Sequence, residues 1–552
     1  MFFNRDRNRM SWIKKIFFFQ LLCCMTAISA QTSIADSLLT SLACGNCHLG
    51  VRQNPDIREM APDLSHAGLR YRPAYIYTFL QSPKRVRYNV GAARMPGFHF
   101  DEREALAVTL FLMKQKKSVN LAVLPKGSVS NVKLEAERLI EGELECTRCH
   151  GLNGKGQNSS TDLTDAGMRL NRDWLKQYLV APRLFDGDDT AMPSYFYQVN
   201  ATTGDYKPVT PDASVRIDAV VDYFMTLTSG EAENREKQFS AIRRQYAEVT
   251  AETGRTIVQS QNCQACHTLD GLEPWFERNG PDLSIESQRV QRGWLIGYLS
   301  EPHAVRPFGY FPGSGSRMPD YRLTDDEVEV LTEHFVKKGS GGSSGTPDNL
   351  SAFSQQKAES LLQEKLSCLG CHRLGGLGGK IGPDLTNAAS RLKAPFVDMM
   401  ILNPRMLVPE SIMPKVPLPS ETARLMGNYL KGAVSQSENL SYLSLIDHEP
   451  YNPKGSVYRE FCSVCHGLNG SGDGFNARYL PKTPISHSDP VLMSERPNDT
   501  LYDGIHAGGA VLNRHHFMPP WGETLSPHDM QSLVEEIRKF CQCEGPKWSE
   551  SQ

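Results

Sequence analysis

The chain has 552 residues, and its 60 Lys and Arg nearly balance its 62 Asp and Glu, which leaves a formal net charge of −2. A chain without a strong net field has no general electrostatic attraction for nucleic acid or for an acidic lipid surface. We therefore predict neither partner.

The first thirty residues predict a secretory signal, 1–30. A basic start precedes an apolar run of 15 residues, 16–30, that ends in small side chains. Because a membrane-spanning helix needs about 20 apolar residues, we favour cleavage after Ala30 over a membrane anchor. A lipid anchor at Cys23 is a weaker alternative, because Leu22 is a poor match before it. The mature chain is thus expected to begin near Gln31, without a stable membrane span, in the periplasm or another extracytoplasmic compartment.

The pattern Cys-x-x-Cys-His occurs five times after this segment. Two cysteines three positions apart lie on neighbouring faces of one helical turn and can add to the two vinyl groups of a porphyrin. The adjacent histidine then lies under the ring and can bind iron. A zinc site would need two further ligands in each segment, and a redox dithiol would not need the histidine. We therefore predict five covalent haem c groups with their iron. The thioether cysteines are Cys44, Cys47, Cys146, Cys149, Cys263, Cys266, Cys368, Cys371, Cys462 and Cys465, and the proximal ligands are His48, His150, His267, His372 and His466.

Of the 14 cysteines, only Cys541 and Cys543 lie outside both the motifs and the signal segment. They could pair with each other, bridge two chains, or stay free. We favour a disulfide between them in the tail.

The motif histidines follow one another at intervals of 94 to 117 residues. This spacing is the length of a small domain and exceeds the 20–50 residues of a solenoid repeat. Each interval has an amphipathic stretch, the motif, a loop-rich middle, a Met-Pro pair and a second amphipathic stretch, and strand-like alternation is weak. The sequence therefore predicts an all-α fold of five consecutive units, at 31–120, 128–231, 246–338, 350–433 and 452–545.

Helical patterns mark the two ends of these units. Val132, Ala136 and Leu139 share one face before the second motif, as expected of an entry helix. Thr324 and Glu327 form a capping-box pattern at the start of a closing helix, and Ser526 with Pro527 begins another. Linkers are predicted at 122–131 and 337–349, and less clearly at 232–246 and 434–452.

A Met-Pro pair lies 41 to 52 residues after each motif histidine. Proline fixes its own φ and holds the preceding residue extended, so a loop of limited freedom can present the thioether to the second face of the iron. A buried methionine is more often plain packing, but five in the same place favour ligation. The predicted distal ligands are Met95, Met192, Met318, Met413 and Met518. Rival ligands are His99, His303, His487, His506, His515 and His516, together with Met406 in the fourth unit.

These motifs resemble class I cytochromes c, which are small all-α electron carriers with His/Met haem ligation, and the resemblance covers nearly the whole mature chain as five units. The segments "APDL" (61–64) and "GPDL" (280–283 and 382–385) are similar to the family segment whose proline carbonyl supports the proximal histidine. The resemblance thereby implies supporting roles for Pro62, Pro281 and Pro383. The second unit has "TDL" (161–163) instead, and the fifth has no such segment.

The predicted function follows from ligation on both iron faces, because such an iron exchanges electrons and has no open position for a substrate. We expect a multihaem c-type cytochrome, not an enzyme, that carries electrons between protein redox donors and acceptors. Methionine ligation favours the higher potentials of a respiratory chain. One alternative is a peroxidase-like enzyme with one open haem, which a unit without Met-Pro would favour. The other is a structural, filament-forming cytochrome; the sequence leaves the oligomeric state open.

Overall fold

The computed structural model describes residues 34–86, 91–125, 127, 132–157, 159–187, 190–272, 279–310, 315–337, 350–432 and 455–549. The predicted signal segment, the 434–452 linker and most of the 337–349 linker lie outside these residues. Within them, no helix is both long and apolar enough to cross a membrane.

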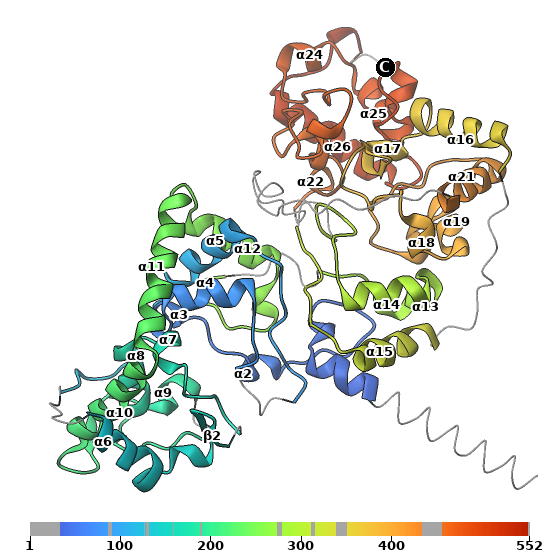
Figure 1. Cartoon of the computed structure of the whole chain (residues 1–552). Coiled ribbons are helices and arrows are strands. Elements are labelled where there is room, and N and C mark those ends of the chain that lie inside the picture. Colours follow the sequence, from blue (N-terminus) through green and yellow to red (C-terminus); the bar gives the residue numbers. More distant parts are fainter. Residues whose placement is uncertain are drawn as a thin grey trace, which may run out of the picture.

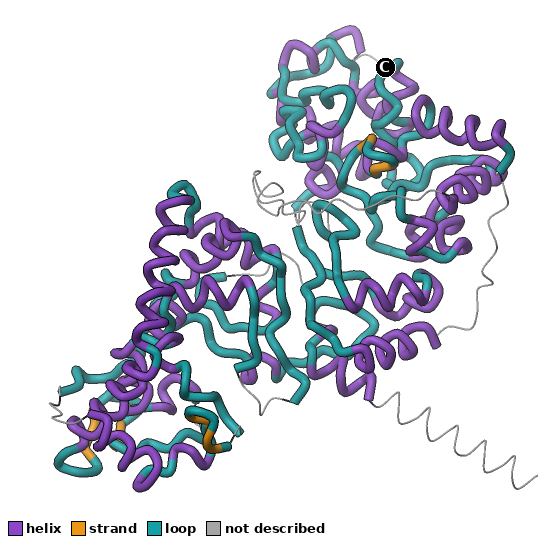
Figure 2. The backbone as a smooth tube through the Cα atoms, in the orientation of Figure 1, coloured by secondary structure: helices purple, strands orange, loops and turns teal. Residues whose placement is uncertain are grey.

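Helices and loops make up nearly all of the fold, as Figure 2 shows, in agreement with the predicted all-α class. Among the described residues, the strands form three short antiparallel ladders, β1–β2, β3–β4 and β5–β6. Figure 1 shows several helical bodies in a row, with the helices of the second motif region at one end and those of the C-terminal region at the other.

The second unit is built from one continuous stretch of chain. The predicted entry helix is present and continues into a π-helical turn, and its Leu139 and Ile140 pack against Ile217 and Val221 of the closing helix. The elements of this unit are α6 (Val132–Glu137), η2 (Arg138–Glu143), η3 (Cys146–Arg148), β1 (Gly151–Leu152), β2 (Lys155–Gly156), α7 (Ala166–Arg169), α8 (Arg172–Val180), α9 (Pro182–Asp186), β3 (Tyr197–Val199), β4 (Tyr206–Pro208) and α10 (Ala213–Leu227).

The fourth and fifth units are also continuous. Ser526 and Asp529 form a capping box at the start of α26, which buries Leu533 and Ile537 against the fifth motif region. The fourth unit has α16 (Ala352–Glu364), α17 (Cys368–Cys371), β5 (Arg373–Leu374), β6 (Leu377–Gly378), α18 (Ala388–Arg391), α19 (Ala394–Leu402), α20 (Pro404–Leu407) and α21 (Ser420–Gly432). The fifth has α22 (Val457–Phe461), α23 (Ser463–His466), η6 (Ala477–Tyr479), α24 (Pro490–Ser494), α25 (Asn498–Ala507), η7 (Gly509–Leu512), α26 (Pro527–Cys541) and η8 (Lys547–Ser549).

The segment predicted as a linker at 232–246 is helical and connects the second unit to the entry helix of the third motif. α11 (Ser229–Gln245) packs Phe239 against Tyr77 of the first region, with ring centroids 5.7 Å apart. The charged residues of α11 form its solvent face, and its other side holds Ala232, Phe239 and Ile242.

The regions 31–120 and 246–338 do not fold as two separate compact bodies; they exchange their N-terminal parts. The first entry helix, 34–41, packs Leu38 and Leu39 on Leu331 and Phe335 of α15 (Asp325–Lys337). The remaining elements of this body are η1 (Cys44–Asn46), η5 (Leu283–Ile285), α13 (Glu286–Arg289) and α14 (Arg292–Ser300). We call this body, 34–54 with 279–337, the Met318 unit.

The complementary body, 57–113 with 249–272, is called the Met95 unit. Its closing helix α5 crosses the entry helix α12 at Gly254, where an added Cβ would overlap the backbone of Ala107. Its elements are α2 (Ile57–Met60), α3 (Ala67–Arg70), α4 (Pro73–Gln81), α5 (Glu102–Leu112), α12 (Ala251–Ser260) and η4 (Cys263–Ala265). The two predicted ranges thus each contribute to both bodies.

Candidate functional site

Each motif forms a single helical turn that places its cysteines and histidine together. In all five, the N–H of the histidine donates to the carbonyl of the first cysteine, as with His48 and Cys44 at 3.0 Å. The ten motif cysteines are not in disulfides, whereas Cys541 and Cys543 are bonded to each other. The tail disulfide favoured from the sequence is therefore confirmed.

The environment of these cysteines argues against a redox dithiol. Burial raises the pKa of the Cys44 and Cys263 thiols to about 12 and that of Cys368 to about 11. A reactive dithiol needs a lowered pKa, because the thiolate is the nucleophile. The described part of the chain also holds no group of three or more His, Cys, Asp or Glu side chains arranged to bind a metal ion such as zinc.

Every motif histidine has its Nδ1 within hydrogen-bonding distance of a backbone carbonyl, so its Nε2 remains for iron. The five contacts are His48–Pro281 at 2.9 Å, His150–Thr161 at 2.6 Å, His267–Pro62 at 3.0 Å, His372–Pro383 at 2.8 Å and His466–Ile485 at 3.0 Å. The proline carbonyls implied by the family resemblance thus do contact motif histidines. The second and fifth units make the same contact without proline, because the acceptor is a backbone atom.

Two of these contacts join different parts of the sequence, because Pro62 supports the third motif and Pro281 supports the first. A second backbone hydrogen bond shows the same exchange of partners between the first and third motif regions. In the second and fourth units, Leu163 and Leu385 donate their N–H groups to the carbonyl of the residue after their own histidine. Leu64 makes the same bond to Thr268, and Leu283 makes it to Leu49. The exchanged bodies therefore keep the contacts of a continuous unit.

The buried imidazoles are held in the form that binds metal. Burial lowers the pKa of His48 to about 4, and the neighbouring Arg289 guanidinium lowers it further, against the opposing effect of the Pro281 carbonyl. Burial also lowers the pKa of His150, His372 and His466. A neutral imidazole keeps a lone pair for coordination at neutral pH.

One continuous cavity of about 790 Å³ runs past four of the motifs. Predicted proximal and distal ligands line it together: His48, His267, His372, His466, Met95, Met318, Met413 and Met518. Within the described residues, the second unit does not reach this cavity; there Met192 packs beside Cys146 against the core of its own unit. Met406, the rival to Met413, is 68% exposed and lies outside the cavity lining.

The distal methionines of the exchanged bodies are also assigned by packing. Met318 belongs to the same apolar cluster as Cys44, and Met95 to the cluster that includes the core of the Met95 unit, whose motif cysteine there is Cys263. The structure therefore places Met318 with the first motif and Met95 with the third. In both cases the motif beside the methionine is not the one that precedes it in the chain.

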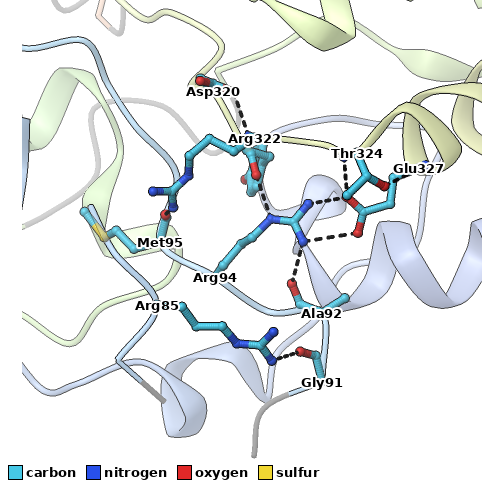
Figure 3. A network of polar contacts seen from close by, with 10 residues as sticks. Arg85, Gly91, Ala92, Arg94, Met95, Asp320, Arg322, Thr324 and Glu327 are labelled. Carbon is cyan, nitrogen blue, oxygen red and sulfur yellow. Dashed lines mark hydrogen bonds and ion pairs between the residues drawn. The ribbon is translucent and has the colours of Figure 1, made fainter. Parts of the chain in front are cut away.

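The two Met-Pro loops bind each other, as Figure 3 shows. Gly97 and Asp320, each two residues after its methionine, exchange both backbone hydrogen bonds at 2.7 Å. Arg94 reaches Glu327 at 2.6 Å and the Tyr321 carbonyl at 2.6 Å, while Arg322 donates to the Met95 carbonyl at 2.6 Å. Glu327 caps α15 at the same time through its predicted capping box with Thr324. Backbone and side-chain contacts thus join the loop that carries Met95 to the loop that carries Met318.

The cavity has a fixed positive lining. Arg289, Arg306 and Arg391 lie together in it; burial and the other two guanidinium groups lower the pKa of Arg391 to about 10. Arg289 has a buried carboxylate partner, Glu286, with Nε and Oε2 3.1 Å apart, whereas Arg306 donates to the Tyr310 carbonyl at 2.7 Å. Buried cations need anionic partners. A haem carries two carboxylates, so this lining, the free cysteines and the neutral imidazoles all fit haem c.

The rival histidines are placed differently. His99 has a side chain that is 59% exposed, whereas His303 and His515 line the cavity. His487 lies on the proximal side of the fifth site, where its ring stacks on His466 with centroids 4.2 Å apart. It is therefore no substitute for Met518 on the distal side.

His487 is also held on its other side. The Tyr458 hydroxyl is 2.9 Å from the ring Nδ1 of His487. The backbone N–H of His487 donates to the Gly470 carbonyl at 2.6 Å. Sequence reasoning grouped it with the rival ligands, because a histidine near a motif has no local signature that separates a stacking ring from an axial one.

Comparison with known proteins supports this reading for two segments. Residues 251–338 match the family model of cytochrome c, and residues 452–535 match that of cytochrome c oxidase, cbb3-type, subunit III. No curated protein and no solved structure gives a significant match. The chain thus carries domains similar to class I c-type cytochromes, which supports covalent haem c and a role in electron transfer.

Proposed function

We propose that the protein is a pentahaem c-type cytochrome that carries electrons between extracytoplasmic redox proteins through five His/Met-ligated haems. The observation that supports this most is the cavity in which four proximal histidines and four methionines meet. The fifth pair, His150 and Met192, lies in the second unit. Bound haem supplies one-electron chemistry at these positions.

The chain's own residues perform the supporting roles. The carbonyls of Pro62, Pro281 and Pro383 orient the proximal imidazoles. The Met-Pro loops present sulfur from the opposite side, and the apolar clusters exclude water. Because every motif has a methionine partner, we propose electron transfer over a peroxidase-like reaction, which would need one open iron.

The first prediction is that the mature protein carries five covalent haems per chain. Each motif has both cysteines unbridged and a histidine that is oriented through its Nδ1, so each is competent for attachment. The intact mass of the purified protein should exceed the polypeptide mass by five haems, and acid extraction should release none. A mass gain of four or fewer would contradict the proposal, and a mature start near Gln31 would support export.

The second prediction concerns His487 in the fifth unit. Replacing it with Leu removes the ring stacked on His466 and the partner of the Tyr458 hydroxyl. Because a neighbour of an axial ligand fixes that ligand's orientation and basicity, we expect the midpoint potential of one haem to shift while the other four keep theirs. A redox titration measures this.

Two control variants separate stacking from hydrogen bonding at the fifth site. His487→Phe keeps an aromatic ring on His466, and Tyr458→Phe removes only the hydroxyl. If His487→Leu leaves all potentials and the electron paramagnetic resonance spectrum of the ferric protein unchanged, His487 is a packing residue alone.

A further inference from the structure

We infer that the haem sites form a row in the spatial order of motifs two, three, one, four and five, so that the first motif in the chain is the middle of the row. This inference rests on the proposed function. It concerns the order in which electrons would pass from one haem site to the next. Because the Met95 and Met318 units exchange their N-terminal parts, this order differs from the order of the motifs in the sequence.

The link between motifs three and one is a direct hydrogen bond between residues of the two motifs. The Asn46 side chain, inside the first motif, donates to the carbonyl of Ala265, inside the third, at 2.8 Å. The thioether edges of these two sites therefore face each other.

The link between motifs four and five has the same form. The Asn476 side chain donates to the carbonyl of Gly370 at 2.9 Å and approaches the Cys465 sulfur at 3.4 Å. Gly370 and Ala265 both occupy the third position of their motifs. In each case an asparagine amide joins a motif edge to its neighbour.

The links between motifs two and three and between motifs one and four both use a short antiparallel backbone pairing. After α3, Tyr71 pairs with Leu170 of the second unit, and after α13, Val290 pairs with Leu392 of the fourth. The flanking bonds match: Arg72 donates its N–H to the Arg169 carbonyl, and Gln291 donates to that of Arg391, both at 2.9 Å. The second unit thus adjoins the Met95 unit, which holds motif three, and the fourth adjoins the Met318 unit, which holds motif one.

Along the row, backbone pairings between units therefore alternate with asparagine hydrogen bonds between motifs. The ends are the second and fifth units, and an electron passing between them crosses the site of motif one. In the order of the sequence, by contrast, motif one would be an end, and its loss would leave the other four connected.

This difference can be tested by counting haems that are reduced together. A photoreductant is attached at Lys155→Cys, an exposed position in the second unit whose side chain is 77% accessible. In the variant Cys44→Ala/Cys47→Ala, which loses the haem of motif one, we expect only two of the four remaining haems to be reduced in the fast intramolecular phase. Dilute or immobilised protein prevents exchange between molecules.

The matched control is Cys462→Ala/Cys465→Ala, which also leaves four haems but removes one end of the row. All four should then be reduced rapidly. If the motif-one variant also reduces all four rapidly, the proposed order is wrong, whether the route follows the sequence or bypasses motif one. If no variant carries covalent haem, the proposed function fails, which the mass measurement shows separately.

A second measurement tests the exchange without haem chemistry. Lys117 Nζ and Asp270 Oδ1 lie 3.6 Å apart, beside the bond between Leu64 and Thr268. A zero-length carbodiimide crosslinker should join them within one chain, and Lys117→Arg should abolish that product. Absence of the crosslink in folded wild-type protein would overturn the exchange and with it the order of the row.

Discussion

Replacing Met318 with Ala is expected to open the iron bound at the first motif, the one that His48 would hold, and to leave the third motif saturated. Met318 packs in one cluster with Cys44 and Leu42, whereas Cys263 of the third motif packs with Met95. Loss of the soft sulfur ligand should lower one midpoint potential by roughly 0.1 V or more, since axial ligands span about 0.8 V. The ferrous variant should bind carbon monoxide at one haem per chain.

The assignment to the first motif is checked by combining variants. In a Cys44→Ala/Cys47→Ala background, Met318→Ala should add no further carbon monoxide site, whereas Met95→Ala should still add one. If Met318→Ala opens a site in that background, its partner is the third motif. Carbon monoxide binding by the unaltered ferrous protein would contradict saturation at all five irons and would favour the peroxidase-like alternative.

Local features of this protein were predictable from sequence because their causes are local. The five motifs each close one helical turn whose geometry depends on four consecutive peptide units. The capping boxes at Thr324 and Ser526 and the buried face of the entry helix at Leu139 follow from short spacings in the same way. The helix starts predicted at Thr324 and Ser526 are therefore confirmed.

The exchange could not be predicted from these features because both arrangements satisfy them. Leu64 and Leu283 make the same hydrogen bond whichever motif they meet, and Pro62 and Pro281 offer the same carbonyl. The choice depends on long-range contacts, such as the paired Met-Pro loops in Figure 3 and the close crossing at Gly254. A family match to residues 251–338 is equally compatible with either arrangement, since it compares sequence and not partners.

The hydrogen-bond partners of His150 and His466 were also not predictable from sequence, because both are backbone carbonyls. Thr161 and Ile485 support His150 and His466 through carbonyl oxygens, which every residue has. Proline at this position is a preference of backbone shape, and its absence removes no acceptor. The position of Thr161 before Asp-Leu, matching that of Pro62, is the signal that could have identified the first of these two contacts.

Replacing Gly280 with Ala is expected to disturb the axial histidine of the first motif. An added Cβ would overlap Cε1 of His48 and lie 2.5 Å from its Nδ1, and real Cβ atoms do not approach other atoms this closely. Either the imidazole tilts away from its Pro281 carbonyl or the loop moves, and overpacking of this kind costs roughly 1–3 kcal/mol of unfolding free energy. Denaturant unfolding and the redox titration of one haem measure the two effects.

The chain supplies matched controls for this substitution. Gly382→Ala should act in the same way on His372, where the added Cβ would lie 2.6 Å from both Cε1 and Nδ1, but within a continuous unit. Gly293→Ala in α14 meets no atom within 4 Å and should keep both stability and spectrum or raise stability slightly. Ala61, in the matching segment beside His267, shows that the third site already accepts a methyl group there. If Gly280→Ala alters the third haem and leaves the first unchanged, Gly280 supports the motif that precedes it in the chain, and the contact with His48 is wrong.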